Sequence, residues 1–220
     1  MGLKVDTIQN ASSGTVNLTL DASGNVAVGN NMTVAGTSTF TGSLGNITAG
    51  TVTASGLVTG ATGALYPVVQ GTAQASTSGT SIDFTSIPSW AKRITINFVG
   101  VSLSGTSLPL VQLGTSSGPV TTGYAGACGN RAGETYFTSG FLAFFNATPS
   151  AANLMSGSMV ISLVTGNTWS EMSVNAASAS NNLAFGGGSI ALAAALDRVR
   201  ITAVNGTDTF DAGTINIQYE

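Results

Sequence analysis

The sequence predicts an all-β protein in which an intertwined, trimeric β shaft precedes a C-terminal antiparallel β-sandwich of the jelly-roll type. Two observations support this fold class. In the N-terminal third, apolar residues recur at six-residue intervals, and in the remainder they alternate with polar residues in short runs. Helical periodicity is almost absent from the 220 residues. The chain is therefore expected to consist of strands and turns.

Residues 1–21 form the first predicted segment. Val16, Leu18 and Leu20 alternate with polar residues, which predicts a short half-buried strand. A turn-forming run, DASGN, begins at Asp21. We expect this segment to dock onto another protein and to become ordered mainly when attached to it.

Residues 22–65 form the predicted shaft. Val28, Val34, Phe40 and Val52 share a six-residue phase, and Gly, Thr, Ser, Asn and Ala fill most of the positions between them. One apolar side chain per six residues cannot build a core within a single chain. The repeat therefore predicts a homotrimer whose chains share one interior, with small residues permitting close backbone approach. The alternative is a flexible linker rich in Gly, Ser and Thr.

Residues 66–220 form the predicted sandwich, which has the size of a typical single domain. Its predicted strands alternate apolar with polar residues. The apolar positions are Ile94, Ile96 and Phe98; Met159, Ile161 and Leu163; Met172 and Val174; Ile190 and Leu192; Val199, Ile201 and Ala203; and Ile215, Ile217 and Tyr219. Residues 205–206 and 211–213 carry turn-forming sequences. Roughly eight short strands joined by polar loops favour an antiparallel sandwich.

The charge content restricts the partners of the chain. Only 7% of residues are charged, and the net charge is -3. This balance provides no basic surface for nucleic acid or an anionic membrane, so we expect neither partner. The longest apolar run, residues 183–196, is interrupted by three glycines and is too short to span a bilayer. Neither membrane insertion nor a signal peptide is predicted.

The residue inventory also restricts the chemistry. The chain has no His, which excludes imidazole-based catalysis and removes the commonest metal ligand. Cys128 is the single cysteine, so the chain cannot form an internal disulfide or a four-thiolate zinc site. We expect Cys128 to be a small buried residue. No metal and no cofactor are predicted.

Aromatic and basic residues near Gly-rich loops are the candidate ligand-binding residues. Trp169 follows a turn-like run and is the leading candidate, and Tyr124 and Tyr136 lie in similar sequence. Aromatic rings can stack on the apolar faces of sugars, but a core position is the alternative for each ring, and it is the favoured one for Trp90. Arg131 either binds an acidic group of a ligand or forms an ion pair with Glu134 or Glu171.

Seven short stretches resemble tailed-bacteriophage fibre proteins. Two are similar to the start of these fibres, two to their shaft repeats, and three to their terminal β-domains. The stretches are KVDTIQN (4–10) and VNLTLD (16–21); GNNMTV (29–34) and GTSTFTG (36–42); and TSIDF (80–84), KRIT (92–95) and DRVRI (197–201).

The resemblance implies a structural protein of the virion exterior, synthesised in the host cytoplasm. The N-terminal segment would bind another virion protein, and the distal domain would face the host. We expect a homotrimeric tail fibre that attaches to a host cell-surface glycan through multivalent, non-covalent contacts. A capsid head fibre or decoration protein is the first alternative, and a polysaccharide depolymerase is the second.

The carboxylates bear on the depolymerase alternative, because glycoside hydrolysis usually needs a pair of them. Asp208 and Asp211 lie together before the last predicted strand, whereas Glu134 and Glu171 are isolated. We expect turn-capping roles for the two aspartates and solvated strand edges for the two glutamates. The chain is therefore predicted not to be an enzyme.

Overall fold

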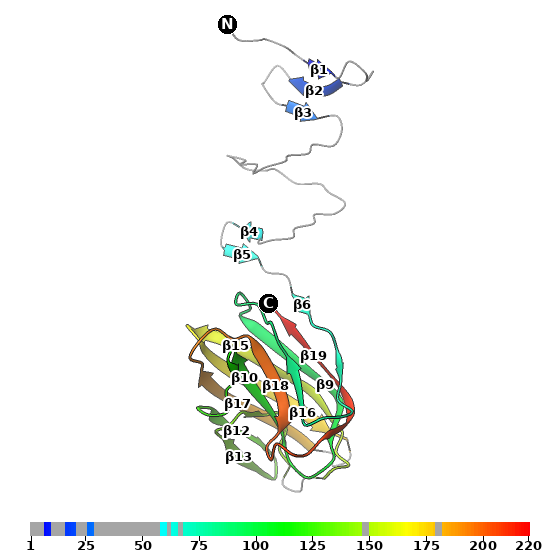
Figure 1. Cartoon of the computed structure of the whole chain (residues 1–220), viewed down its shortest axis with the longest axis vertical. Helices are drawn as coiled ribbons and strands as arrows, with labels where there is room; N and C mark the ends of the chain where they lie inside the picture. Colours follow the sequence, from blue (N-terminus) through cyan, green and yellow to red (C-terminus); the bar gives the residue numbers. More distant parts are fainter. Residues whose placement is uncertain are drawn as a thin grey trace. The chain divides into compact units, whose positions relative to one another are not determined.

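The computed structural model describes residues 7–9, 16–20, 26–28, 58–60, 63–65, 68–146, 150–178 and 182–220. The chain divides into two units, Met1–Ala54 and Ser55–Glu220. Within the described residues every regular element is a β-strand, and the sheets are antiparallel (Figure 1). The predicted all-β class is therefore confirmed.

The first unit contains a three-stranded antiparallel sheet of order β1–β2–β3. Its strands are β1 (Thr7–Gln9), β2 (Val16–Leu20) and β3 (Val26–Val28). β2 coincides with the strand predicted for the N-terminal segment. In the second unit, β4 (Val58–Gly60) pairs with β5 (Gly63–Leu65). Most of the predicted shaft and its three-chain interior lie outside the described residues.

The smaller of two large sheets has five strands in the order β11–β10–β18–β8, with β14 also paired to β10. The strands are β8 (Ser81–Phe84), β10 (Pro109–Thr115), β11 (Gly118–Pro119), β14 (Phe141–Leu142) and β18 (Arg198–Ala203). Arg200 lies opposite Asp83 in the register and binds its carboxylate with two hydrogen bonds of 2.8 and 2.9 Å. The outer face of this sheet therefore carries paired charges.

The larger sheet has nine strands in the order β13–β12–β17–β16–β15–β9–β19–β6, with β7 also paired to β19. The strands are β6 (Val69–Gln70), β7 (Gln74–Ala75), β9 (Arg93–Leu103), β12 (Ala125–Asn130), β13 (Gly133–Phe137), β15 (Met155–Thr165), β16 (Thr168–Ala177), β17 (Asn182–Ala191) and β19 (Phe210–Tyr219). Five of these strands have ten or eleven residues, so they are longer than the short strands predicted.

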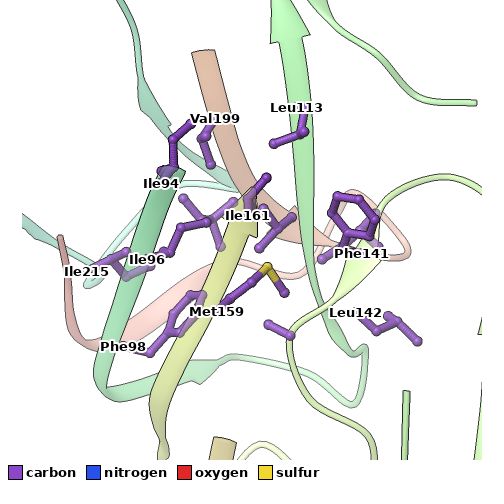
Figure 2. Close-up of a cluster of buried hydrophobic side chains, with 14 of the residues drawn as sticks. Ile94, Ile96, Phe98, Leu113, Phe141, Leu142, Met159, Ile161, Val199 and Ile215 are labelled. Carbon is purple, nitrogen blue, oxygen red and sulfur yellow. The ribbon is translucent and has the colours of Figure 1, made fainter. Parts of the chain in front are cut away.

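The two large sheets share one hydrophobic core, which gives the second unit its sandwich-like arrangement. Figure 2 shows side chains from both sheets converging in this core. The larger sheet contributes Ile94, Ile96, Phe98, Met159, Ile161 and Ile215, and the smaller sheet contributes Leu113, Phe141, Leu142 and Val199. Most of the predicted alternating strands face this core with their apolar positions, because removing those side chains from water stabilises the fold by roughly 1.5–3 kcal/mol each.

Eight strands of the two large sheets pair in a nested order along the chain. β15 pairs with β16 as a hairpin, β12 with β17, β10 with β18, and β9 with β19. Each pair encloses the previous one in sequence. The first and last of these strands, β9 and β19, therefore lie side by side in the larger sheet (Figure 1).

Two local predictions are wrong. Residues 211–213 lie inside β19 rather than in a turn, at a place where the pairing with β9 shifts register. Gly213 has a φ of 99°, so a β-bulge uses the same left-handed glycine that a turn would use. In β16, Met172 and Val174 point outward and are 63% and 51% exposed, whereas the apolar side of a half-buried strand should face inward.

Candidate ligand-binding groove

The hairpin of β12 and β13 carries two of the predicted binding residues. Asn130 pairs with Gly133 at the end of the hairpin, and residues 131–132 form the turn. The Asn130 side-chain oxygen accepts hydrogen bonds from the backbone N–H groups of Ala132 and Gly133, at 2.8 and 3.2 Å. This Asx arrangement is a common way for Asn to stabilise a tight turn. It holds Arg131 at the exposed tip.

A groove of about 380 Å³ lies beside this turn, on the outer face of the larger sheet. It is formed by β12, the turn, the start of β13 and the middle of β17. The lining residues are Ala127, Gly129, Asn130, Arg131, Ala132, Gly133, Glu134, Phe185, Gly186 and Gly187. Its volume falls within the range of pockets that hold small molecules.

The groove exists because small residues meet across the strands. Gly129 pairs with Phe185, and Ala127 pairs with Gly187, so one member of each pair is a glycine. A Cβ atom at Gly129 would lie 2.8 Å from the Cβ of Glu134, which excludes any larger residue there without movement. At Gly187 the nearest atom to such a Cβ, a backbone oxygen, is 3.8 Å away, so the surface there is open.

Two aromatic rings lie beside the small residues Ala127, Gly129 and Gly187, which form the floor of the groove. Phe185 is 59% exposed on one side. On the other side Tyr136 is 76% exposed and lies opposite Ala127 in the register of the hairpin. The Tyr136 hydroxyl donates a hydrogen bond of 3.3 Å to the Glu134 carboxylate. The groove thus combines apolar ring faces with a carboxylate, a guanidinium and the Asn130 amide.

Arg131 is free to reach a ligand. It is exposed at the turn, and the described residues hold no ion pair to it. The alternative predicted from the sequence, an ion pair to Glu134 or Glu171, is therefore not found in the described part of the chain. Glu171 is buried on the opposite side of the sheet, which removes it from reach.

Trp169 does not belong to this groove. It follows the two-residue turn of the β15–β16 hairpin, as the sequence predicted, but only 3% of it is exposed. The ring packs in the core, so it offers no face to a glycan. The leading candidate contact is therefore corrected to a core residue.

Tyr124 is also a core residue rather than a surface contact, with 3% exposure. Its hydroxyl accepts a hydrogen bond from the Leu113 N–H at 2.7 Å and lies 3.0 Å from the Val120 carbonyl, to which it can donate. Its ring packs edge-on against Phe141. Burial raises the pKa of Tyr124 well above its ordinary value. Trp90, by comparison, is half-buried and packs against Tyr219, as expected of a core or interface aromatic.

The expectation for Glu171 is wrong. Instead of lying at a solvated strand edge, it points into the core from β16 and is 5% exposed. Burial raises its pKa to about 7, and the nearby Ser173 hydroxyl partly offsets that rise. Cys128 is buried as predicted. Its pKa is raised to about 12, mainly by burial and secondarily by the negative charge of Glu171. These two groups lie outside the groove.

The other carboxylates have structural surroundings. Glu134 is exposed on the edge strand β13, as predicted. Asp208 accepts hydrogen bonds from the Ser107 N–H and the Asn205 amide, which lower its pKa and fulfil the predicted turn-capping role. Among the described residues no group of three or more Cys, Asp and Glu could hold a metal ion. The described part of the chain also has no helix long and apolar enough to cross a membrane.

Phe185 and Asn130 are groove residues that are not among the predicted ones. A signal for Asn130 is present in the sequence, because Asn followed three residues later by Gly is typical of a tight hairpin. Phe185 precedes the three glycines 186–188, but only the strand register reveals which side of the sheet its ring occupies. Comparisons of the chain with protein-family models, curated proteins and solved structures found no match.

Proposed function

We propose that this protein is a structural subunit of a homotrimeric virion fibre, in which the β12–β13 groove binds a host cell-surface glycan. The fibre assignment rests on the sequence resemblance to tailed-bacteriophage fibres. The attachment role rests on one structural observation, the exposed groove lined by Phe185 and Arg131, with Tyr136 beside Ala127 at its margin. Receptor binding would then be non-covalent and repeated on each subunit.

The chemistry of the groove suits a sugar. The ring faces of Tyr136 and Phe185 can cover the apolar faces of a pyranose. Glu134 can accept hydrogen bonds from sugar hydroxyls, and the Asn130 amide offers a further polar group. Arg131 adds a planar cation that suits a carboxylate or phosphate on the sugar. An acidic surface polysaccharide is therefore the ligand class that we favour.

The groove favours binding over cleavage. Glu134 is the one carboxylate among its lining residues, whereas glycoside hydrolysis usually places two across the scissile bond. Glu171 lies on the inner face of the same sheet and cannot serve as the second carboxylate. These positions support attachment rather than depolymerase activity.

The strand pairing supports the jelly-roll-like part of the proposal. A jelly roll wraps one long antiparallel ribbon, so its strands pair first with last in a nested order. The four nested pairs from β15–β16 outward to β9–β19 follow this order, with β10–β18 in the smaller sheet and the other three pairs in the larger one. We place this domain at the end of the fibre, where three copies would present three grooves and multiply a weak affinity.

Binding of the full chain to immobilised bacterial surface polysaccharides tests the attachment role. Tyr136→Ala and Arg131→Ala should each weaken binding at least tenfold, because they remove a stacking face and a cation from the groove. Val204→Ala is the matched control, since Val204 is 53% exposed but follows β18 of the smaller sheet. Equal binding by all three variants contradicts the groove assignment.

The position on the virion needs a separate experiment. Labelled antibody against the protein should mark the tail of intact virions if the chain is a tail fibre. Labelling of the capsid instead would favour the head-fibre or decoration alternative while leaving the groove test unchanged.

A further inference from the structure

A small cavity lies between the two large sheets at one end of the sandwich. Its walls come from the end of β9 and the start of β15 in the larger sheet, and from the start of β10 in the smaller one. None of its lining residues lines the groove beside the β12–β13 turn. The cavity is therefore a separate candidate site.

The cavity lies far from the strand by which the chain enters this domain. Val69 of β6 pairs with Tyr219, and Tyr219 pairs with Ile94 near the beginning of β9. Val101, toward the other end of β9, lines the cavity. The strand from Ile94 to Val101 spans roughly 25 Å. A ligand can therefore reach the cavity without meeting β6.

The interior of the cavity is apolar. Val101, Phe144 and Met155 line it and are almost completely buried. The volume is about 30 Å³. Because one water-sized group needs roughly 10–15 Å³, the cavity has room for about two or three non-hydrogen atoms. A sugar ring or an aromatic ring is too large to enter, whereas a methyl group and the carbon that carries it fit.

Polar groups line the surface side of the cavity. The Ser107 hydroxyl oxygen accepts a hydrogen bond from the Asn205 N–H at 3.0 Å, and the Ser150 hydroxyl oxygen accepts one from the Ala152 N–H at 3.2 Å. These bonds hold both oxygens in place, and neither hydroxyl donates a hydrogen bond to another described residue. The Asn153 amide also lines the cavity and can both donate and accept.

We infer that this cavity binds the acetamido group of an N-acetylated sugar. The methyl group fills the apolar interior, and the amide oxygen accepts hydrogen bonds from the two serine hydroxyls. Asn153 binds the amide N–H or a neighbouring sugar hydroxyl. The sugar ring stays outside the cavity. The inference goes beyond the proposed function, because it assigns a second site with a different chemistry.

Other small ligands fit the cavity less well. A fatty acyl chain needs a far larger volume. A phosphate or a carboxylate needs a cation, and none of the described residues that line the cavity is charged. The methyl end of an acetylated lysine fits inside, but its apolar stem then lies across polar groups. A sugar, whose hydroxyls can bond to those groups, is therefore the carrier that we assign.

Saturation-transfer difference NMR on the full chain tests this site. The sugars are N-acetylglucosamine, N-acetylgalactosamine and N-acetylmannosamine, each compared with its unacetylated amine. For at least one sugar we expect the acetyl methyl protons to receive the strongest saturation, and the matching amine to receive at least tenfold less. Absence of that signal for all three sugars overturns the inference. Stronger saturation of N-acetyl-lysine than of every sugar contradicts the sugar assignment.

Two variants locate the bound methyl group. Val101→Ile adds one carbon to the interior and should weaken binding of the responding sugar at least fivefold. Val99→Ile is the matched control, because it makes the same change at an exposed position of β9 and should bind normally. Asn153→Ala should also weaken binding, and it keeps the test valid if Val101→Ile fails to fold. Normal binding by Asn153→Ala and by folded Val101→Ile overturns the site.

The groove variants separate this inference from the proposed function. Tyr136→Ala and Arg131→Ala should leave the acetyl signal unchanged, since neither residue lines the cavity. Loss of the acetyl signal in these variants places the sugar in the groove and overturns the cavity site. Normal polysaccharide binding without any acetyl signal overturns the cavity site and leaves the proposed function intact.

Discussion

Glu171 of β16 lies opposite Ile161 of the adjacent strand β15, and both side chains are buried on the inner face of the larger sheet. Neither carboxylate oxygen of Glu171 has a partner at ordinary hydrogen-bond distance. Ser173 and Trp169, the neighbouring inward residues of β16, also have buried polar atoms without such a partner. This strand therefore introduces an acidic group into the buried layer, where its charged form is poorly solvated.

The first prediction is that the domain loses stability as the pH rises through the neutral range. The pKa of Glu171 is about 7 in the folded chain, against an ordinary value of 4.5. Below 4.5 the carboxyl is neutral in both states, and between the two values the unfolded chain ionises first. The free energy of unfolding should therefore fall by about 3 kcal/mol between pH 4.5 and pH 8 on account of this group. Urea denaturation at pH 5 and pH 8 measures the difference.

Two substitutions separate this effect from other titrations. Glu171→Gln should remove most of the pH dependence and raise stability at pH 8, because it replaces a buried ion with a neutral amide. Glu134→Gln, at an exposed position, should leave the pH dependence as it is. If the free energy of unfolding falls equally between pH 5 and pH 8 in the unmodified chain and in both variants, Glu171 is not the responsible group.

The second prediction concerns two adjacent glycines of β17. A Cβ atom at Gly188 would lie 2.8 Å from two ring carbons of Phe137, whereas at Gly187 its nearest neighbour would be 3.8 Å away. Gly188→Ala should therefore lower the free energy of unfolding by about 1–3 kcal/mol through overpacking. Gly187→Ala is the matched control and should change stability little. Thermal unfolding of both variants at one pH measures the two changes in stability.

The third prediction is that Tyr124→Phe destabilises the domain without changing its ligand binding. The substitution leaves the buried Leu113 N–H and the Val120 carbonyl without the hydroxyl that now lies within hydrogen-bond distance. We expect a loss of about 1–3 kcal/mol, measured by denaturant unfolding. Weaker polysaccharide binding by the folded variant would instead place Tyr124 in a ligand site.

The fourth prediction follows from the corrected position of Trp169. Trp169→Ala should lower the free energy of unfolding by about 3–5 kcal/mol, because it leaves a cavity in the core. Tyr136→Ala removes an exposed ring and should cost much less stability. The milder Trp169→Phe, if folded, should bind polysaccharide like the unmodified chain. A specific binding loss in that variant would contradict the assignment of Trp169 to the core.

Strand positions were predictable from the sequence wherever one face of a strand is clearly apolar. Ile94, Ile96 and Phe98 alternate with Thr95 and Asn97, and β9 buries those three apolar residues. The sequence DAG at 211–213 misled because a glycine with positive φ serves a bulge as well as a turn. Local sequence cannot distinguish these two uses, since the partner strand decides which one occurs.

Which side chains of β16 point toward the core was not predictable in the same way. Met172 and Val174 are the aliphatic positions that suggest an inward face, yet Glu171 and Ser173 point inward instead. Pairing with β15 and β17 sets this facing, and it also buries Trp169. The candidate site was predictable only in part, because Arg131 belongs to a local hairpin whereas Phe185 comes from a strand far along the chain.

The place of β19 in the nested pairing has a consequence for synthesis on the ribosome. This strand is translated last among the described strands, yet it lies within the larger sheet and pairs with β9 along most of its length. Until it emerges, β9 presents an open edge to other nascent chains. Folding of the sandwich is therefore expected to finish only once β19 has been synthesised, and messages truncated before β19 should yield aggregating products.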